Sequence, residues 1–322
     1  MSENHHYYQE FISAMLEVVP QRATLTRTIT DILGIDKDAV YRRMRGEVDF
    51  SFVEMAVLAR KMGISLDTLA GIDTERCKTI RISLPIHVDP TEVDYSMFSD
   101  YISALKFIKD EPDTKIMEGG NLLPHYIYYD YDYITRVFLF RWSQSSKFGK
   151  SLPFHEIIIP ERLRDMQKQA SYYSRHIKST IYVWDNRIFE QFLSLVKFYA
   201  HVRLIREEDV FMIKQDMLTL LDDIEKMAVT GKHKDTGNDV AIYIGELNAD
   251  SNFGYIESKS IHLCQFRAFL LNAFTSWESL LFDEISSWLN SALKLTTLIS
   301  VSGEKIRTDF FAAQRDLVDM LA

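Results

Sequence analysis

The sequence has few cysteines and no long apolar run. Only two cysteines occur among the 322 residues, Cys77 and Cys264, and they are too far apart in sequence to share a metal-ligand motif. They therefore predict reduced thiols in a cytoplasmic protein and argue against a disulfide framework. Charge interrupts every apolar run well before ~18 residues, so we expect no transmembrane segment. The first residues combine neither a basic stretch nor a continuous apolar one, so we expect no secretory signal.

Sequence motifs of the common catalytic centres are also missing. No pair of histidines has the spacing of a metal site such as H-x-x-x-H. The run VSGEK lacks the first glycine of a G-x-S-x-G nucleophile elbow. The segment 235–239, DTGND, lies in a polar stretch without the second copy that an aspartic protease would need. We therefore predict no catalytic residue, no metal site and no cofactor, and a protein that is not an enzyme.

One short segment is basic although the whole chain is acidic. The formal net charge is -9, yet residues 36–50, DKDAVYRRMRGEVDF, hold a lysine and three arginines within nine positions. An acidic surface repels a polyanion, so a single basic face would restrict a nucleic acid to one orientation. This contrast favours a local DNA-binding surface over nonspecific coating of nucleic acid.

The N-terminal residues 5–73 predict short helices only, because apolar residues recur at helical spacing between turn signals. Gly34 and Gly63 suit the ends of helices, since glycine accepts a positive φ. Asp36 is a good N-cap, and Ser51 with Glu54 has the pattern of a capping box. The expected helices run through residues 7–19, 24–33, 37–45 and 52–61.

The helix expected over 37–45 has two different faces. Val40 and Met44, one turn apart, form its inward face. A helix that enters the major groove presents hydrogen-bonding groups to base edges from its first turns, while flanking cations neutralise phosphates. We therefore predict a DNA-binding surface with outward and flanking side chains from Lys37, Asp38, Tyr41, Arg42, Arg43 and Arg45.

The run 34–69 resembles the helix-turn-helix of the lambda-repressor and Cro-like (xenobiotic-response-element) regulators. Gly34-Ile35 matches the turn, Arg45-Gly46 matches the end of the recognition helix, and LARKMGISLDTL matches the helix that follows. Thr30 stands where that family usually has a small alanine. Asp38 and Tyr41 stand where small polar base readers are common, so the DNA sequence that would be read stays open. The resemblance implies double-stranded DNA as the partner.

The rest of the chain predicts a larger α+β domain. We expect a helix-turn-helix domain at 1–73, a connector at 74–90 and an effector or dimerisation domain at 91–322. Apolar and aromatic runs predict strands at 125–131, 134–142, 155–160, 179–184, 240–247, 253–258 and 261–271, the last ones antiparallel. Helical spacing predicts helices at 92–109, 161–176, 186–203, 207–228, 275–295 and 303–321. The EGGN run at 118–121 predicts a turn.

Two apolar patterns in this domain have more than one interpretation. Alternation along 125–131 would put Tyr126, Tyr128 and Asp130 on one face, either lining a small-molecule pocket or, the favoured alternative, forming a half-buried β surface. A stripe of Trp277, Leu281, Ile285 and Leu289 is typical of core. It could also be a dimer face, as could the closing helix 303–321.

Together these patterns predict a cytoplasmic transcription regulator that binds DNA as a homodimer, with no membrane partner. Its second domain would dimerise, sense a small molecule or a protein, or do both; this rests on analogy with two-part regulators. Two alternatives remain at this point. One is an interaction scaffold or antitoxin-like partner whose helix-turn-helix no longer reads DNA. The other is an enzyme with an appended DNA-binding domain.

Overall fold

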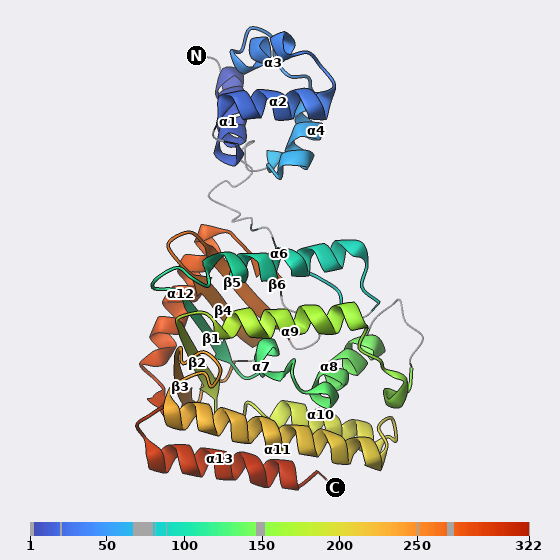
Figure 1. The fold of residues 1–322 in the computed structure, drawn as a ribbon, viewed down its shortest axis with the longest axis vertical. Helices are drawn as coiled ribbons and strands as arrows, with labels where there is room; N and C mark the ends of the chain where they lie inside the picture. Colours follow the sequence, from blue (N-terminus) through green and yellow to red (C-terminus); the bar gives the residue numbers. More distant parts are fainter. Residues whose placement is uncertain are drawn as a thin grey trace. The chain divides into compact units, whose positions relative to one another are not determined.

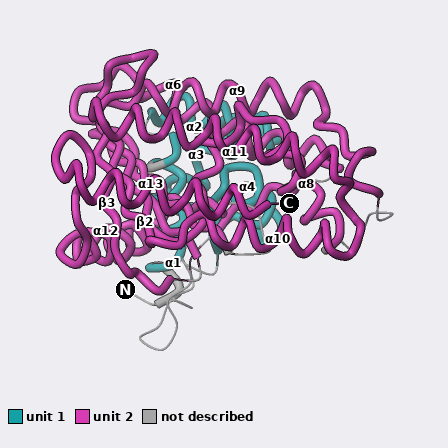
Figure 2. The backbone as a smooth tube through the Cα atoms, turned by 90° about the horizontal axis from the view of Figure 1, so that it is seen from below, with its two compact units in different colours: residues 1–79 teal, residues 80–322 magenta. Residues whose placement is uncertain are grey.

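The chain consists of two compact units, residues 1–79 and 80–322 (Figure 2). The computed structural model describes residues 3–19, 21–66, 80, 82–87, 89–145, 152–249, 251–268 and 274–321. The division between the units falls inside the predicted connector 74–90, of which residues 74–79, 81 and 88 lie outside the described residues. Among the described residues, no helix is both long enough and apolar enough to cross a membrane.

Helices are the only regular secondary structure among the described residues of the first unit, as predicted (Figure 1). Its helices are α1 (Glu3–Val18), α2 (Arg22–Leu33), α3 (Lys37–Met44) and α4 (Phe52–Met62). One core holds them together, in which Phe11, Leu25, Ile29, Val40 and Leu58 are fully buried or nearly so. Each helix contributes to this core, so burial of apolar area stabilises helices that are too short to persist alone.

Local caps set the helix boundaries, and the predicted ones are confirmed. Gly34 follows α2 with φ 66°, the left-handed conformation that glycine adopts without strain. The Asp36 carboxylate accepts a hydrogen bond from Ala39 N at 2.7 Å and begins α3. Ser51 Oγ accepts from Glu54 N at 3.2 Å while the Glu54 carboxylate accepts from Ser51 N at 2.7 Å, a complete capping box at the start of α4.

The second unit is an α+β fold built on one mixed sheet of seven strands. The strands lie in the order β6-β5-β4-β1-β2-β3-β7. Strands β1, β2 and β3 are parallel, β4, β5 and β6 form an antiparallel series next to β1, and β7 is antiparallel to β3. Their bounds are β1 Lys115–Gly120, β2 Ser179–Asp185, β3 Asp239–Gly245, β4 Ser251–Glu257, β5 His262–Ala268, β6 Phe274–Ser276 and β7 Thr297–Leu298.

Helices cover both faces of this sheet, and each face has its own apolar core. Successive residues of β1 alternate between them: Ile116 belongs to the larger core and Met117 to the smaller. Helix α12 (Ser279–Leu293) covers the face of the sheet that carries the smaller core. The other face and the layer beyond it (Figure 1) contain α6 (Glu92–Ile108), α7 (His125–Tyr128), α8 (Asp132–Ser145), α9 (Glu161–Arg175), α10 (Glu190–His201), α11 (Glu207–Thr230) and α13 (Glu304–Asp319).

Three predicted strands are wrong. The runs 125–131 and 134–142 form α7, a turn and α8, and 155–160 contains only a short 3₁₀ turn, Phe154–Glu156. Tyrosine, isoleucine and phenylalanine favour strands, but tertiary packing decides here. Ile134, Val137 and Phe138 are buried at spacings of three and four residues, which places them on one side of a helix.

Strand β1 lies where the sequence predicted a turn. Its last residues, Gly119 and Gly120, weaken the strand signal because glycine has no side chain to pack. The structure explains why a side chain is absent. A Cβ on Gly120, whose φ is 143°, would approach Asn252 Oδ1 and Ser251 O to 2.3 Å. Gly120 therefore permits close contact between β1 and β4, and Gly119 permits close contact with Leu289 of α12.

The predicted stripe on 275–295 serves mainly as core. Ile285 and Leu289 are buried against the sheet, and Leu281 is partly buried beside them. Trp277 precedes α12 and is 51% exposed, so it lies outside the helix that was to carry the stripe. Burial of these positions within one chain leaves little of the stripe for a second copy.

Candidate functional site

Helix α3 presents most of the predicted DNA-binding residues to solvent. Val40 is its one fully buried residue. The side chains of Lys37, Asp38, Tyr41, Arg42 and Arg45 are all exposed. Four of these residues lie on the eight-residue helix α3, and the fifth, Arg45, is its C-cap.

Arg43 differs from the other five because its side chain joins α3 to α4. Its guanidinium lies 3.0 Å from Glu54 Oε1, and the two side chains are only about one-fifth exposed. Burial acts to raise the pKa of Glu54, but hydrogen bonds from Ser51 and Arg43 outweigh it and hold that pKa below its usual value. Tyr8 also donates to Arg43 O at 2.8 Å. Arg43 therefore positions α3 against α4.

One acidic residue sits beside the exposed arginines. Glu47 Oε1 lies 3.1 Å from Arg45 Nε, and Glu47 Oε2 lies 3.8 Å from Arg42 Nε. Both arginine side chains are about 60% exposed, so these pairs contribute little to stability. A phosphate can therefore replace the Glu47 carboxylate at small cost.

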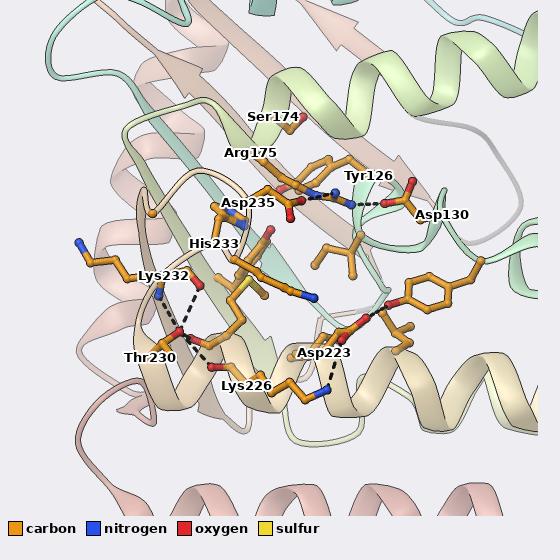
Figure 3. Close-up of a pocket in the computed structure, with 18 residues that line it drawn as sticks. Tyr126, Asp130, Ser174, Arg175, Asp223, Lys226, Thr230, Lys232, His233 and Asp235 are labelled. Carbon is orange, nitrogen blue, oxygen red and sulfur yellow. Dashed lines mark hydrogen bonds and ion pairs between the residues drawn. The ribbon is translucent and has the colours of Figure 1, made fainter.

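The second unit contains a cavity of about 930 Å³ on the helix-covered side of its sheet (Figure 3). Its walls come from α7, the C-terminal end of α9, β2, the C-terminal half of α11 and the loop 231–237. Tyr126 and Asp130 line it, as the pocket interpretation of the aromatic run required, but Tyr128 does not. Tyr126 lies in α7, Asp130 lies in the turn that follows it, and Tyr128 packs into the larger core instead.

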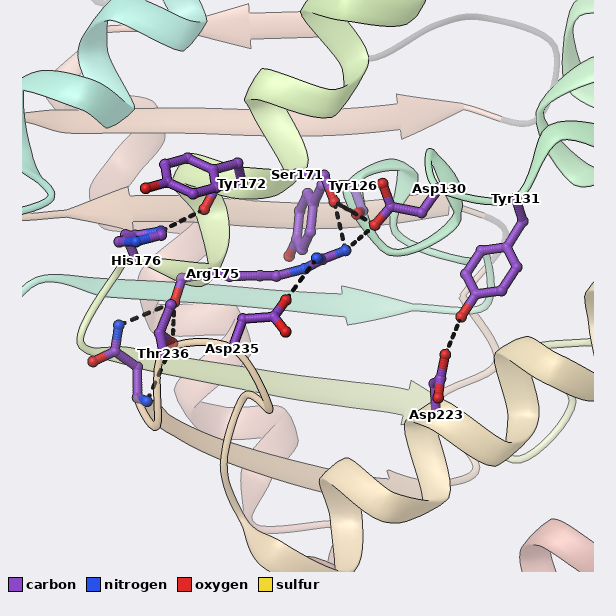
Figure 4. Close-up of polar contacts among 11 residues, drawn as sticks. Tyr126, Asp130, Tyr131, Ser171, Tyr172, Arg175, His176, Asp223, Asp235 and Thr236 are labelled. Carbon is purple, nitrogen blue, oxygen red and sulfur yellow. Dashed lines mark hydrogen bonds and ion pairs between the residues drawn. The ribbon is translucent and has the colours of Figure 1, made fainter.

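Charged side chains at the rim of the cavity are bound to one another (Figure 4). Arg175, the last residue of α9, pairs with Asp130 through Nη2 and with Asp235 through Nη1, the latter at 3.1 Å. Arg175 Nη2 also donates to Ser171 Oγ at 2.9 Å. Asp223 on α11 accepts a hydrogen bond from the Tyr131 hydroxyl at 2.7 Å. These bonds fix segments that are far apart in sequence.

The deep end of the cavity is polar but uncharged. Tyr126, Ser174 and Tyr182 are all buried there. Burial, with the nearby Glu118 carboxylate, raises the pKa of Tyr126 well above its ordinary value, so the hydroxyl keeps its proton. Burial and then the charge of Arg175 lower the pKa of His233 to about 4, so this imidazole is neutral at neutral pH.

Sequence reasoning missed most of this cavity. Arg175, Ser174 and His233 carried no motif, and Asp235 belonged to the DTGND segment, which was considered as an aspartic-protease motif. They come from α9 and the loop after α11, and only the folded sheet brings them near Tyr126. The aromatic run at 125–131 was the one available signal. Among the described residues, no group of three or more histidine, cysteine, aspartate or glutamate side chains is placed to hold a metal ion.

Comparison of the chain with protein-family models, curated proteins and solved structures gave no match. The two sites, the exposed face of α3 and the cavity, are therefore interpreted from their own geometry.

Proposed function

We propose that this protein is a sequence-specific DNA-binding transcription regulator. In this proposal α2 and α3 form a helix-turn-helix, and α3 is the recognition helix. The observation that carries the proposal is the division of α3 into two sides. Val40 and the Arg43–Glu54 pair fix one side, while the other presents exposed cations on a protein whose net charge is -9.

The exposed side chains of α3 match what a DNA groove requires. Lys37 lies in the first turn and can donate to guanine O6 and N7, and Asp38 can accept from cytosine N4. Arg42 and Arg45 lie in and just after the last turn, where they can neutralise phosphates. Base contacts then come from the start of the helix and phosphate contacts from its end.

The contacts that hold α3 in place favour a rigid recognition helix. Asp36 caps its first turn, and Arg43 ties it to α4 through Glu54. A recognition helix has to hold its side chains in a fixed register against the bases, because a shift of about 1 Å breaks a bidentate hydrogen bond. The first unit supplies this rigidity with its own core.

The proposal assigns the cytoplasm as the location and a homodimer as the binding form. One recognition helix contacts too few base pairs for a unique site, and paired helices overcome this by reading two half-sites. The second unit would supply the pairing, a sensing function, or both.

Salt dependence of DNA binding tests the proposal. Each phosphate contact adds close to one unit to the slope of log affinity against log salt. We expect Arg42→Ala and Arg45→Ala each to reduce that slope by ~1 and to weaken binding to every DNA sequence. Arg60→Ala removes an exposed arginine from α4 and is the matched control.

Two results would contradict the assignment. One is a full chain that does not bind duplex DNA at low salt. The other is a slope that Arg60→Ala changes as much as Arg42→Ala and Arg45→Ala do. A slope lowered only by the two α3 variants supports α3 as the contact surface.

A further inference from the structure

We propose that the cavity of the second unit binds an organic monocarboxylate, with the carboxylate at Lys234 and the apolar body of the ligand against the buried floor. The cavity volume of about 930 Å³ lies within the range of known ligand pockets. The inference rests on the second unit alone. Its failure can therefore be distinguished from a failure of DNA binding by α3.

The floor of the cavity offers an apolar contact surface. Leu220 and Ile224 of α11 are each 1% exposed, and Met227 of the same helix is partly buried. The rings of Tyr126 and Tyr182 line the same cavity, with centroids 6.4 Å apart and planes tilted by 29°. Each Å² of apolar ligand surface that these side chains remove from water contributes about 25 cal/mol to binding.

The hydroxyl groups on this floor already have partners within the protein. The Tyr126 hydroxyl interacts with Glu118 and with Tyr182, and the Ser174 hydroxyl interacts with Tyr101. A buried polar group costs free energy only when it lacks a partner, so these hydroxyl groups require none from a ligand. Ring faces and aliphatic side chains remain as the contact surface of the floor, and recognition of a polar group falls to the mouth.

The carboxylates that line the cavity each have a cationic partner. Asp130 and Asp235 both bind Arg175, the latter at 3.1 Å. Asp223 lies 3.7 Å from Lys226 Nζ and accepts a hydrogen bond from a tyrosine hydroxyl as well. A cationic ligand would have to displace one of these partners, so the lining disfavours a positive charge on the ligand.

Lys234 is the cation of the lining that lacks such a partner. Lys232 pairs with Asp239 just outside the cavity. The exposed Lys234 side chain, in contrast, has no ion pair with a described residue. An anion beside Lys234 therefore gains an ion pair without breaking one. A single unpaired cation matches a single negative charge on the ligand.

Contacts on both sides of Lys234 hold its backbone in place. His233 is 8% exposed, and Asp235 pairs with Arg175. Thr236 Oγ1 also donates to Arg175 O at 2.8 Å. Figure 4 shows Asp235 and Thr236 reaching Arg175 from the same loop. A loop that is fixed before binding loses less entropy when the ligand binds.

Isothermal titration calorimetry of the full chain, with three probes that share one alkyl chain, tests the class of ligand. At neutral pH decanoate carries a negative charge, decanol carries none and decylammonium carries a positive charge. We expect decanoate to bind saturably at one site per chain, decanol to bind more weakly and decylammonium to bind most weakly. Added salt should weaken the binding of decanoate and leave that of decanol unchanged, because salt screens an exposed ion pair.

Paired variants locate the two ends of the ligand. Lys234→Gln should weaken decanoate binding about two- to fivefold and leave decanol binding unchanged. Lys305→Gln removes another exposed lysine, on α13, and is the matched control. Met227→Trp narrows the cavity and should weaken the binding of both probes, whereas Val229→Trp, at an exposed position of the same helix, should change neither.

Any of three outcomes would overturn the proposal. Decanoate could fail to saturate on the folded chain. Decanol or decylammonium could bind as tightly as decanoate, which would contradict recognition of a negative charge. Lys234→Gln and Lys305→Gln could have equal effects, which would place the carboxylate away from Lys234. Because Lys234→Gln changes an exposed side chain, circular dichroism should show an unchanged fold, and a loss of decanoate binding then reports the site itself.

Discussion

The exposed face of α3 and the cavity of the second unit use charge in opposite ways. On α3 the cations of Arg42 and Arg45 are about 60% exposed and share one weak partner, Glu47. Around the cavity Arg175 is about one-third exposed and is bound by Asp130 and Asp235. Charges that remain free suit a polyanion that brings its own counter-charge. Charges that are already paired instead join the segments that line the cavity.

The comparison also extends to stability, because each unit has its own core. Leu25 is fully buried in the first core. We expect Leu25→Ala to lower the free energy of unfolding of the first unit by about 2–5 kcal/mol, since it leaves a cavity. DNA binding should fall with it, while the second unit should stay folded on its own core.

Two spectroscopic signals separate the units in that experiment. All four tryptophans lie after residue 80, so tryptophan fluorescence during urea unfolding reports the second unit. Far-ultraviolet circular dichroism reports both units. We expect Leu25→Ala to shift the dichroism curve and to leave the fluorescence curve unchanged. An equal shift in both would show that the units unfold together.

Acid should destabilise the second unit selectively. Burial lowers the pKa of His87 and of His233 to about 4, from an ordinary value of 6.5. Between these values the unfolded chain binds protons that the folded chain does not, so stability is full above pH 6.5 and falls as the pH drops toward 4. The expected loss is on the order of 2–3 kcal/mol for each histidine.

Fluorescence-detected unfolding at pH 7 and pH 5 measures this loss. His87 and His233 together should lower the free energy of unfolding between pH 7 and pH 5. His233→Gln should remove about half of that combined loss. His201→Gln changes an exposed histidine on α10 and serves as the control. An unaltered pH dependence in His233→Gln would contradict the neutral buried imidazole.

The smallest expected effect concerns Glu47, whose carboxylate competes with DNA for Arg42 and Arg45. We expect Glu47→Gln to tighten DNA binding about threefold, in line with one added electrostatic contact at moderate salt. Asp49→Asn removes an exposed negative charge two residues later and is the matched control. Equal tightening in both variants would mean that only net charge matters, and weaker binding in Glu47→Gln would contradict competition.

Local signals made the first unit predictable, and nonlocal contacts made the second unit difficult. Gly34, Asp36 and the Ser51–Glu54 pair each cap a helix through a group no more than four residues away in the sequence. The sequence therefore shows these signals directly. Strand β1 could not be predicted in the same way. Gly120 is explained by Asn252 and Gly119 by Leu289, both more than a hundred residues later.

Prediction of the cavity from the sequence was limited in the same way, because its residues come from distant segments. The run 125–131 suggested a pocket, but its apparent alternation led to a predicted strand. The structure has the short helix α7 followed by a turn, and together they place Tyr126 and Asp130 in the lining of the cavity. Their partner, Arg175, comes from α9 and carries no motif. The predicted face of α3, by contrast, depends only on helical periodicity, and Arg43 alone among its six residues turned out to be tied to another helix.

Selection of bound sequences from a random DNA pool tests the central claim, that α3 reads bases, most directly. We predict that the full chain enriches a pseudo-palindromic site with half-sites about one helical turn, ~10–10.5 bp, apart. Lys37→Ala or Asp38→Ala should change the preferred base at one position in each half-site, with a discrimination of ~1–3 kcal/mol. No enriched site, or the same site in the wild type and both variants, would contradict the claim.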